Sequence, residues 1–278
     1  MLNNKIKRTT SLAAAFFILT ALCGCAGGEK TAETAKSLPP QGDVHYSALS
    51  NTCCGWGFRR TDSRPEFTPQ QIEMMNKYNC IYMGSEKEKA LYLTFDEGYE
   101  NGYTSLILDT LKEKSVPAAF FVTGPYVKGE PELIMRMAKE GHIIGNHTVN
   151  HPSLPSVSTA KEIYDEVNEL DRLVYGVCKQ RCKYLRPPKG EYSERTLAIT
   201  NDLGYINTFW SLAYVDWKND VSAAQAEQSV LSNLHNGCVL LLHAVSKGNA
   251  DALASIIDKA RAQGYEFKSL DEYTLGQN

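Results

Sequence analysis

The chain has 278 residues, of which 43% are hydrophobic and 22% are charged, so its composition excludes a disordered protein. The length is sufficient for one large globular domain of the size that an α/β barrel needs. The formal net charge is −3, and it becomes −6 without residues 1–24, which hold three basic residues and no acidic ones. Because nucleic-acid-binding surfaces carry the opposite sign, no nucleic acid partner is expected.

The first 24 residues have the pattern of a signal peptide. Three basic residues within the first eight precede an apolar run at 12–22, which is too short for a membrane-spanning helix. The run ends at 22–25 in Leu-Cys-Gly-Cys, which resembles the bacterial lipobox with Cys25 as the acylated residue. Cys23 is unusual in that motif, so cleavage without lipidation is the alternative. We expect an exported protein at the outer face of the cytoplasmic membrane or in the cell wall, held at the membrane surface by a lipid anchor.

Residues 25–44 are rich in Gly, Pro and small polar residues, a composition typical of a flexible linker. The next stretch, 45–87, includes a short aromatic segment at 54–58, and we interpret it as an N-terminal extension that packs across the domain that follows. From residue 88 to residue 278, apolar runs of strand length alternate with segments of helical period, which predicts one domain.

This domain is predicted to contain seven strands, at 91–95, 118–122, 143–145, 184–185, 206–210, 239–242 and 267–270. Segments of helical period separate them, and such alternation implies parallel strands with crossover helices. We therefore expect an α/β fold, an incomplete or distorted (β/α)7 barrel. An open doubly wound sheet is the alternative, but Asp96 and Glu97 follow the first strand, where a nucleotide-binding loop would need glycines.

Polar residues end or follow five of the predicted strands. They end or follow the first, third, fourth, fifth and sixth strands, in the order Asp96, His147, Arg186, Asp216 and His243. The carboxyl ends of parallel strands meet at one face of an α/β fold, so side chains far apart in the sequence can converge there. We expect the functional site at this face.

His147 and His151 are four positions apart and can present two imidazoles to one ion from a single turn or loop. An isolated pair with this spacing is more often structural, but a pair of carboxylates after another strand favours metal binding. Two imidazoles plus oxygen ligands suit Zn, and Mn or Co are alternatives.

The adjacent carboxylates of Asp96 and Glu97 cannot face the same way if the strand continues, so we expect them to have different roles. One can bind the cation while the other takes a proton from water. Two solvated acids at a strand end are the alternative. A carboxylate such as Asp216 bound to the ring of His243 would raise the pKa of the imidazole and keep it a proton donor.

Five segments of the chain resemble, in order, the motifs of the polysaccharide deacetylase (NodB homology) family. They are Thr-Phe-Asp-Glu-Gly-Tyr at 94–99, His-Thr-Val-Asn-His-Pro at 147–152, Arg-Pro-Pro-Lys-Gly at 186–190, Asp-Trp at 216–217 and Leu-Leu-Leu-His at 240–243. The resemblance covers roughly residues 88–275 and implies a distorted (β/α)7 barrel of the NodB-homology type. A finer resemblance is to the delta-lactam-biosynthetic de-N-acetylase branch, the peptidoglycan N-acetylmuramic acid deacetylases, at 100–104, 191–197, 209–213 and 244–250.

The resemblance implies a role for each of these polar residues: Asp96 is the general base, Arg186 orients it, His147 and His151 hold a divalent metal, Asp216 tunes His243, and His243 is the general acid. Substrate binding would involve Lys189, through its main-chain amide, together with Trp217 and Tyr99. Glu97 departs from the family, most of which has Asp there as a third metal ligand. The resemblance leaves open whether Glu97 ligates the metal, and it implies a weaker or altered metal dependence.

The function implied by the resemblance is hydrolysis of a carbon–nitrogen bond in a linear amide. The hypothesis is de-N-acetylation of N-acetylmuramic acid in the glycan strand of peptidoglycan, leading to muramic delta-lactam in the spore cortex. Two alternatives remain: a deacetylase of another N-acetylated glycan, and a wall-glycan-binding module without catalysis. Substrate profiling would separate the two enzymatic hypotheses, and binding without acetate release would identify the third.

Overall fold

The structure is a computed structural model, and it describes residues 42–218 and 221–274. The signal peptide, Cys25 and most of the expected linker lie outside the described residues, so those expectations stay predictions. The described elements belong to one unit, Lys36–Asn278. No helix within the two described ranges combines the length with the apolar character that a membrane span requires.

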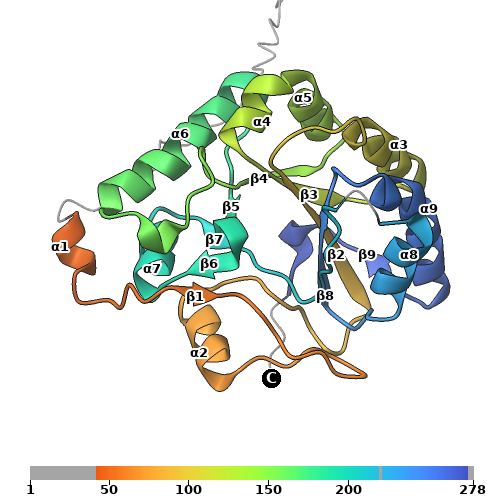
Figure 1. The fold of residues 1–278 in the computed structure, drawn as a ribbon, viewed down its shortest axis with the longest axis horizontal. Coiled ribbons are helices and arrows are strands. Elements are labelled where there is room, and N and C mark those ends of the chain that lie inside the picture. The colour runs from red at the N-terminus through yellow and green to blue at the C-terminus, as the bar shows by residue number, and fades with distance from the viewer. Residues whose placement is uncertain (1–41, 219–220, 275–278) are drawn as a thin grey trace, which may run out of the picture. The chain divides into compact units, whose positions relative to one another are not determined.

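One parallel sheet runs through the described domain (Figure 1). Its strand order is β7-β5-β4-β3-β2-β8, and β9 also pairs with β2. The strands are β2 (Ala90–Glu97), β3 (Ala118–Val122), β4 (Ile143–Asn146), β5 (Tyr184–Leu185), β7 (Ile206–Asn207), β8 (Cys238–His243) and β9 (Glu266–Phe267). Strands β2 and β3 are buried along their whole length, which explains why they appear in the sequence as continuous apolar runs.

The sheet curls because the chain after β7 reaches the strand at the other end of the order. Leu212 bridges Leu240 of β8, and the Leu241 amide donates to the Leu212 carbonyl at 2.9 Å. This closure, with helices outside, confirms the expected distorted (β/α)7 barrel (Figure 1). The strand expected at 206–210 is shorter than predicted, because Thr208 makes a single bridge with Ile81 in place of a ladder.

Helices flank the strands, with α8 and α9 beside β8 and β2 (Figure 1). They are α1 (Asp43–Tyr46), α2 (Pro69–Lys77), α3 (Thr104–Lys114), α4 (Gly124–Gly129), α5 (Pro131–Lys139), α6 (Ala160–Cys178), α7 (Glu194–Asp202), α8 (Ala223–Leu231) and α9 (Lys247–Ala262). Three short 3₁₀ helices are η1 (Leu154–Ser156), η2 (Pro188–Gly190) and η3 (Leu270–Glu272). The strand expected at 267–270 ends at Phe267, because Ser269 caps η3.

Helix α6 shows how local sequence specifies an element. Its core-facing residues recur at helical spacing and are fully buried: Ile163, Val167, Leu170 and Val174. The hydroxyl of Thr159 accepts from the Glu162 amide at 3.1 Å, forming a capping box that starts the helix. Lys179 ends it in the left-handed region.

The N-terminal extension is joined to the loop after β5. Strand β1 (Cys54–Gly55) pairs antiparallel with β6 (Glu191–Tyr192), and the Trp56 amide donates to the Gly190 carbonyl at 2.8 Å. The indole Nε1 of Trp56 donates to the Trp210 carbonyl at 2.8 Å, and its ring lies 4.6 Å from that of Phe209. The extension therefore supports the segment that begins at Arg186.

Candidate active site

Asp96 and Arg186 form a buried ion pair at the carboxyl ends of β2 and β5. The Arg186 Nη1 atom donates to Asp96 Oδ1 at 2.6 Å, and Arg186 is fully buried. Burial acts to raise the pKa of Asp96, but the charges of Arg186 and of nearby histidines lower it overall. Asp96 is therefore held as a carboxylate, the form that can accept a proton.

The guanidinium of Arg186 is fixed on all sides. Its Nη2 donates to the Thr94 hydroxyl at 2.9 Å and its Nε to the Thr208 carbonyl at 3.1 Å. It lies 4.1 Å from the centre of the Phe121 ring. A side chain at Gly145 would meet that ring at 2.5 Å, so glycine allows Phe121 to lie there. These contacts hold the Arg186 guanidinium in place, so it can orient the carboxylate of Asp96.

His147 and His151 lie together, with ring centres 4.8 Å apart. The His147 Nδ1–H donates to the Arg186 carbonyl at 2.8 Å, which leaves Nε2 as the basic nitrogen, 3.5 Å from Asp96 Oδ2. Burial lowers the pKa of His147 to about 4, and burial also lowers that of His151 although Asp96 opposes it. Both rings are therefore neutral near pH 7, the form that binds metal ions.

The loop between the two histidines is held by hydrogen bonds. The Thr148 amide donates to Asn146 Oδ1 at 2.9 Å, and the His151 amide donates to the Thr148 hydroxyl at 3.0 Å. Thr148 and His151 have positive φ values of 66° and 57°, which few non-glycine residues adopt. Gly124 donates its amide to the Val149 carbonyl at 3.0 Å and has no room for a methyl group.

Glu97 has surroundings different from those of Asp96, which is paired with Arg186. Its carboxylate is fully buried, and neither oxygen has a hydrogen-bond partner within the described part of the chain. Burial raises its pKa well above the usual range, with Glu100 and Asp96 adding to the effect. The pKa of Tyr126 in α4 is also raised, mainly by burial, and the neighbouring Glu97 adds to this effect. Since neighbouring residues of a strand alternate, Glu97 faces the side of β2 opposite to Asp96, as the sequence predicts.

The two histidines offer part of the ligand set that a divalent metal requires. Two neutral imidazoles close together, one oriented by a carbonyl on its other nitrogen, suit such an ion. Residues 42–218 and 221–274 hold no group of three His, Cys, Asp or Glu side chains arranged for a metal. The histidine pair therefore fits a divalent cation, while the assignment of Glu97 as a ligand stays a prediction.

His243 ends β8, the strand next to β2, and its position is paired with that of Asp96. Its Nδ1–H donates to Asp216 Oδ1 at 2.7 Å, and its main-chain amide donates to Asp216 Oδ2 at 2.7 Å. Burial acts to lower the pKa of His243, but the hydrogen bond and charge of Asp216 raise it overall. His243 is thus suited to donate a proton from Nε2.

Asn249, in the first turn of α9, completes this group and was not identified from the sequence. Its amide donates to Asp216 Oδ2 at 2.6 Å and to the His243 carbonyl at 3.0 Å, while the Tyr214 hydroxyl donates to its carbonyl oxygen. The one sequence signal for Asn249 was its place in the segment 244–250, which resembles the de-N-acetylase branch. Thr94 was also missed, although its position two residues before Asp96 puts it on the same face of β2.

The three residues expected to bind substrate are all exposed. Trp217 and Tyr99 are 51% and 58% exposed, and the Trp217 ring lies 5.4 Å from that of His243. Lys189 is exposed on η2, with a positive φ of 60°. The structure thus places an aromatic surface beside the histidine that can donate a proton.

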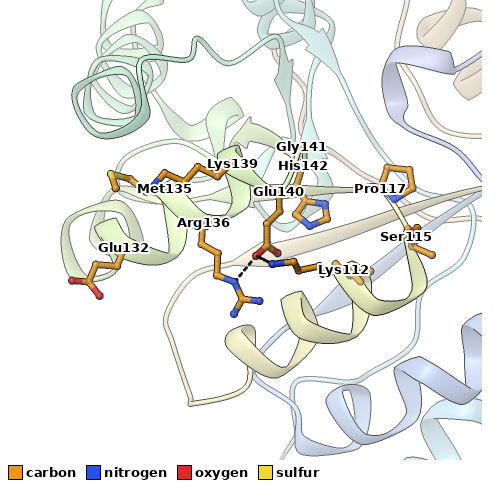
Figure 2. Close-up of a pocket in the computed structure, with 12 residues that line it drawn as sticks. Lys112, Ser115, Pro117, Glu132, Met135, Arg136, Lys139, Glu140, Gly141 and His142 are labelled. Atoms are coloured by element: carbon orange, nitrogen blue, oxygen red, sulfur yellow. Dashed lines mark hydrogen bonds and ion pairs between the residues drawn. The ribbon is translucent and has the colours of Figure 1, made fainter.

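A separate pocket of 860 Å³ lies between α3 and α5, and His142 contributes to its wall (Figure 2). His142 precedes β4, at the end of the strands away from the site, and its Nδ1 accepts from the Ala118 amide at 3.3 Å. Glu140 beside it binds Arg136 at 2.9 Å (Figure 2). The pocket includes none of the predicted site residues, which agrees with a structural role for His142.

Residues 83–207 match the family described as polysaccharide deacetylase. The peptidoglycan-N-acetylmuramic acid deacetylase PdaA of Bacillus subtilis (strain 168) is 45% identical over 236 residues, 83% of this chain and 89% of that protein. A peptidoglycan-N-acetylglucosamine deacetylase of Bacillus cereus is 34% identical over 76% of this chain and 77% of its own. The solved structure of Bacillus subtilis PdaA, a family 4 carbohydrate esterase, has a TM-score of 0.79 and covers 81% of this chain and 98% of its own, at 44% identity. The chain therefore belongs to the polysaccharide deacetylase family and is an amide-bond hydrolase of that family.

Proposed function

We propose that this chain removes the acetyl group from N-acetylmuramic acid in peptidoglycan in a metal-dependent reaction, the step that leads to muramic delta-lactam in the spore cortex. The named activity of the 45% identical Bacillus subtilis relative supports this substrate. The distinction matters because the 34% identical Bacillus cereus relative is named for the other sugar of peptidoglycan, N-acetylglucosamine.

One observation carries the proposed chemistry: Asp96 and His243 occupy paired positions on the neighbouring strands β2 and β8. Their environments move the two pKa values in opposite directions, to a lower value for the carboxyl and a higher one for the imidazole. A base and an acid of this kind at one site are what amide hydrolysis requires.

In this proposal Asp96 takes a proton from the attacking water while Arg186 keeps the carboxylate ionised and in place. His243 gives its Nε2 proton to the sugar nitrogen as the bond between that nitrogen and the acetyl carbon breaks. Acetate and a free amine on the sugar are the products. His147 and His151 would hold a divalent cation, Zn or alternatively Mn or Co, which would polarise the acetyl carbonyl when bound. The main-chain amide of Lys189 would donate to the same oxygen.

The cellular location is also a proposal. The N-terminal signal pattern and Cys25 support export and a lipid anchor, with the membrane surface as a partner and no nucleic acid. Loss of the protein from the membrane fraction in Cys25→Ser, with wild type retained there, is the expected result. Equal release of both proteins would contradict the anchor.

The test of the activity is mass spectrometry of purified peptidoglycan fragments before and after treatment with the zinc-loaded protein. We expect muramic acid to lose one acetyl group, and we expect Asp96→Asn and His243→Ala to abolish this loss. His45→Ala is the matched control, because His45 lies on α1 with a side chain 49% exposed. If only glucosamine loses its acetyl group, the substrate is N-acetylglucosamine and not N-acetylmuramic acid. Binding without acetate release would identify a non-catalytic module.

A further inference from the structure

Lys189 carries a positive charge at the edge of the site. It lies in η2, three residues after Arg186, and both it and Gly190 have positive φ values, of 60° and 67°. A non-glycine residue in this region is energetically unfavourable, so surrounding contacts must hold the backbone there.

The contacts that hold Lys189 come from the N-terminal extension and from the chain after β7. The Gly190 carbonyl accepts from the Trp56 amide at 2.8 Å, and the Gly190 amide donates to the Pro187 carbonyl at 3.0 Å. A methyl group on Gly190 would lie 2.8 Å from the Trp210 ring and 3.0 Å from Trp56 Cβ. The backbone at Lys189 is therefore held in place, while its side chain is exposed.

Within residues 42–218 and 221–274, the ammonium group of Lys189 makes no ion pair with a carboxylate. Two other exposed lysines do make such pairs. Lys183 pairs with Asp271 at 2.7 Å, and Lys247 pairs with Asp251. The ammonium group of Lys189 is therefore available to an anionic ligand beside the loop that begins at Arg186, whose side chain pairs with Asp96.

We propose that the Lys189 ammonium binds a carboxylate that the substrate sugar carries on the carbon next to the one with the acetamido group. This rests on the proposed function, because N-acetylmuramic acid differs from N-acetylglucosamine only by a lactyl ether with a carboxylate at that position. Tyr99 and Trp217, the other two residues expected to bind substrate, can contact a sugar ring but carry no positive charge. A lysine suits this task, since its flexible stem presents a compact charge.

Lys218 provides a matched control. It is also exposed, it follows Trp217, and it makes no ion pair within the described ranges. Replacing either lysine by Met removes one positive charge from the protein and keeps a long side chain. Only Lys189 lies on the loop that begins at Arg186, so the two variants should differ.

The experiment uses short peptidoglycan glycan strands with free lactyl carboxylates and the same strands with these groups converted to primary amides. Acetate release gives kcat/KM for each substrate with the zinc-loaded full chain. We expect wild type to prefer the carboxylate by about 5-fold, the size expected for an exposed charge pair, and the preference to fall as salt is added. We expect Lys189→Met to lose the preference, Lys189→Glu to reverse it, and Lys189→Arg and Lys218→Met to keep it.

Each other result has a defined meaning. If wild type releases no acetate from either muramic strand, the proposed function itself fails. If wild type is active and Lys189→Met keeps the preference, the assignment to Lys189 is overturned. Loss of the preference in Lys218→Met, or an equal fall of kcat/KM for both substrates in Lys189→Met, also overturns it. Lys189→Gln serves as the second neutral variant if Lys189→Met does not fold.

Discussion

Asp216 binds His243 through both of its carboxylate oxygens, with Oδ1 accepting from the ring Nδ1–H and Oδ2 from the main-chain amide, each at 2.7 Å. The first bond raises the pKa of the imidazole against the effect of burial, and the second fixes the backbone at the end of β8. One side chain thus sets both the protonation and the position of His243.

Asp216→Asn should therefore lower the pKa of His243, because burial then acts without an opposing charge. A proton-donating His243 loses activity as pH rises through its pKa, so the basic limb of kcat/KM against pH should move to lower pH in the variant. The same pair should stabilise wild type below about pH 6.5 and cease to do so as pH rises through the raised folded-state pKa. An unchanged basic limb would show that another group donates the proton.

Glu97→Gln tests whether Glu97 is a metal ligand. Because burial raises the pKa of Glu97, its carboxyl favours the folded state at low pH, and this contribution is lost as pH rises from about 4.3 through the folded-state pKa. The variant should therefore gain in Tm relative to wild type as pH rises, and its zinc affinity should match wild type by calorimetric titration. His147→Ala is the contrasting variant, expected to lose zinc affinity. A large loss of affinity in Glu97→Gln would restore Glu97 to the ligand set.

Gly124→Ala should disturb the histidine loop. The added methyl group would lie 2.8 Å from the Val149 carbonyl, so the loop or α4 must shift, at a cost of about 1–3 kcal/mol in the free energy of unfolding. We expect weaker zinc binding and slower acetate release. Gly129→Ala, in the same helix, meets nothing within 4 Å and should behave like wild type in both assays. Equal zinc affinity in the two variants would mean that the loop does not depend on this contact.

Trp56 links the extension to the catalytic loop, and two variants separate its contributions. Trp56→Phe keeps a ring near Phe209 but loses the hydrogen bond to the Trp210 carbonyl, which should cost about 1 kcal/mol of stability. Trp56→Ala removes the ring as well and should cost about 3 kcal/mol. In Trp56→Ala we also expect kcat to fall more than KM rises, because Gly190 loses its support. A fall in Tm with unchanged kcat would limit the extension to a structural role.

Much of the fold could be predicted because the relevant signals are local. Strand β3 has the bounds expected from its apolar run, 118–122, and the buried residues of α6 recur at helical spacing. Strand β7 was predicted too long because Phe209 and Trp210 extend its apolar run to 210, yet Thr208 makes an isolated bridge with Ile81 and the chain goes on to bridge β8 at Leu212. Which partners a short segment meets depends on the closure of the barrel, and hydrophobic pattern does not encode it.

The sequence by itself determined the alternation of strands and helices, the polar residues at the strand ends, and the opposite directions of Asp96 and Glu97, since each of these follows from the period of a single element. Only the tertiary structure decided the partners: the Thr94 hydroxyl accepts from Arg186, the Asn249 amide donates to Asp216, and the Trp56 amide donates to Gly190. These contacts join residues far apart in the chain, and they exist because strand register and barrel closure bring those residues within hydrogen-bonding distance.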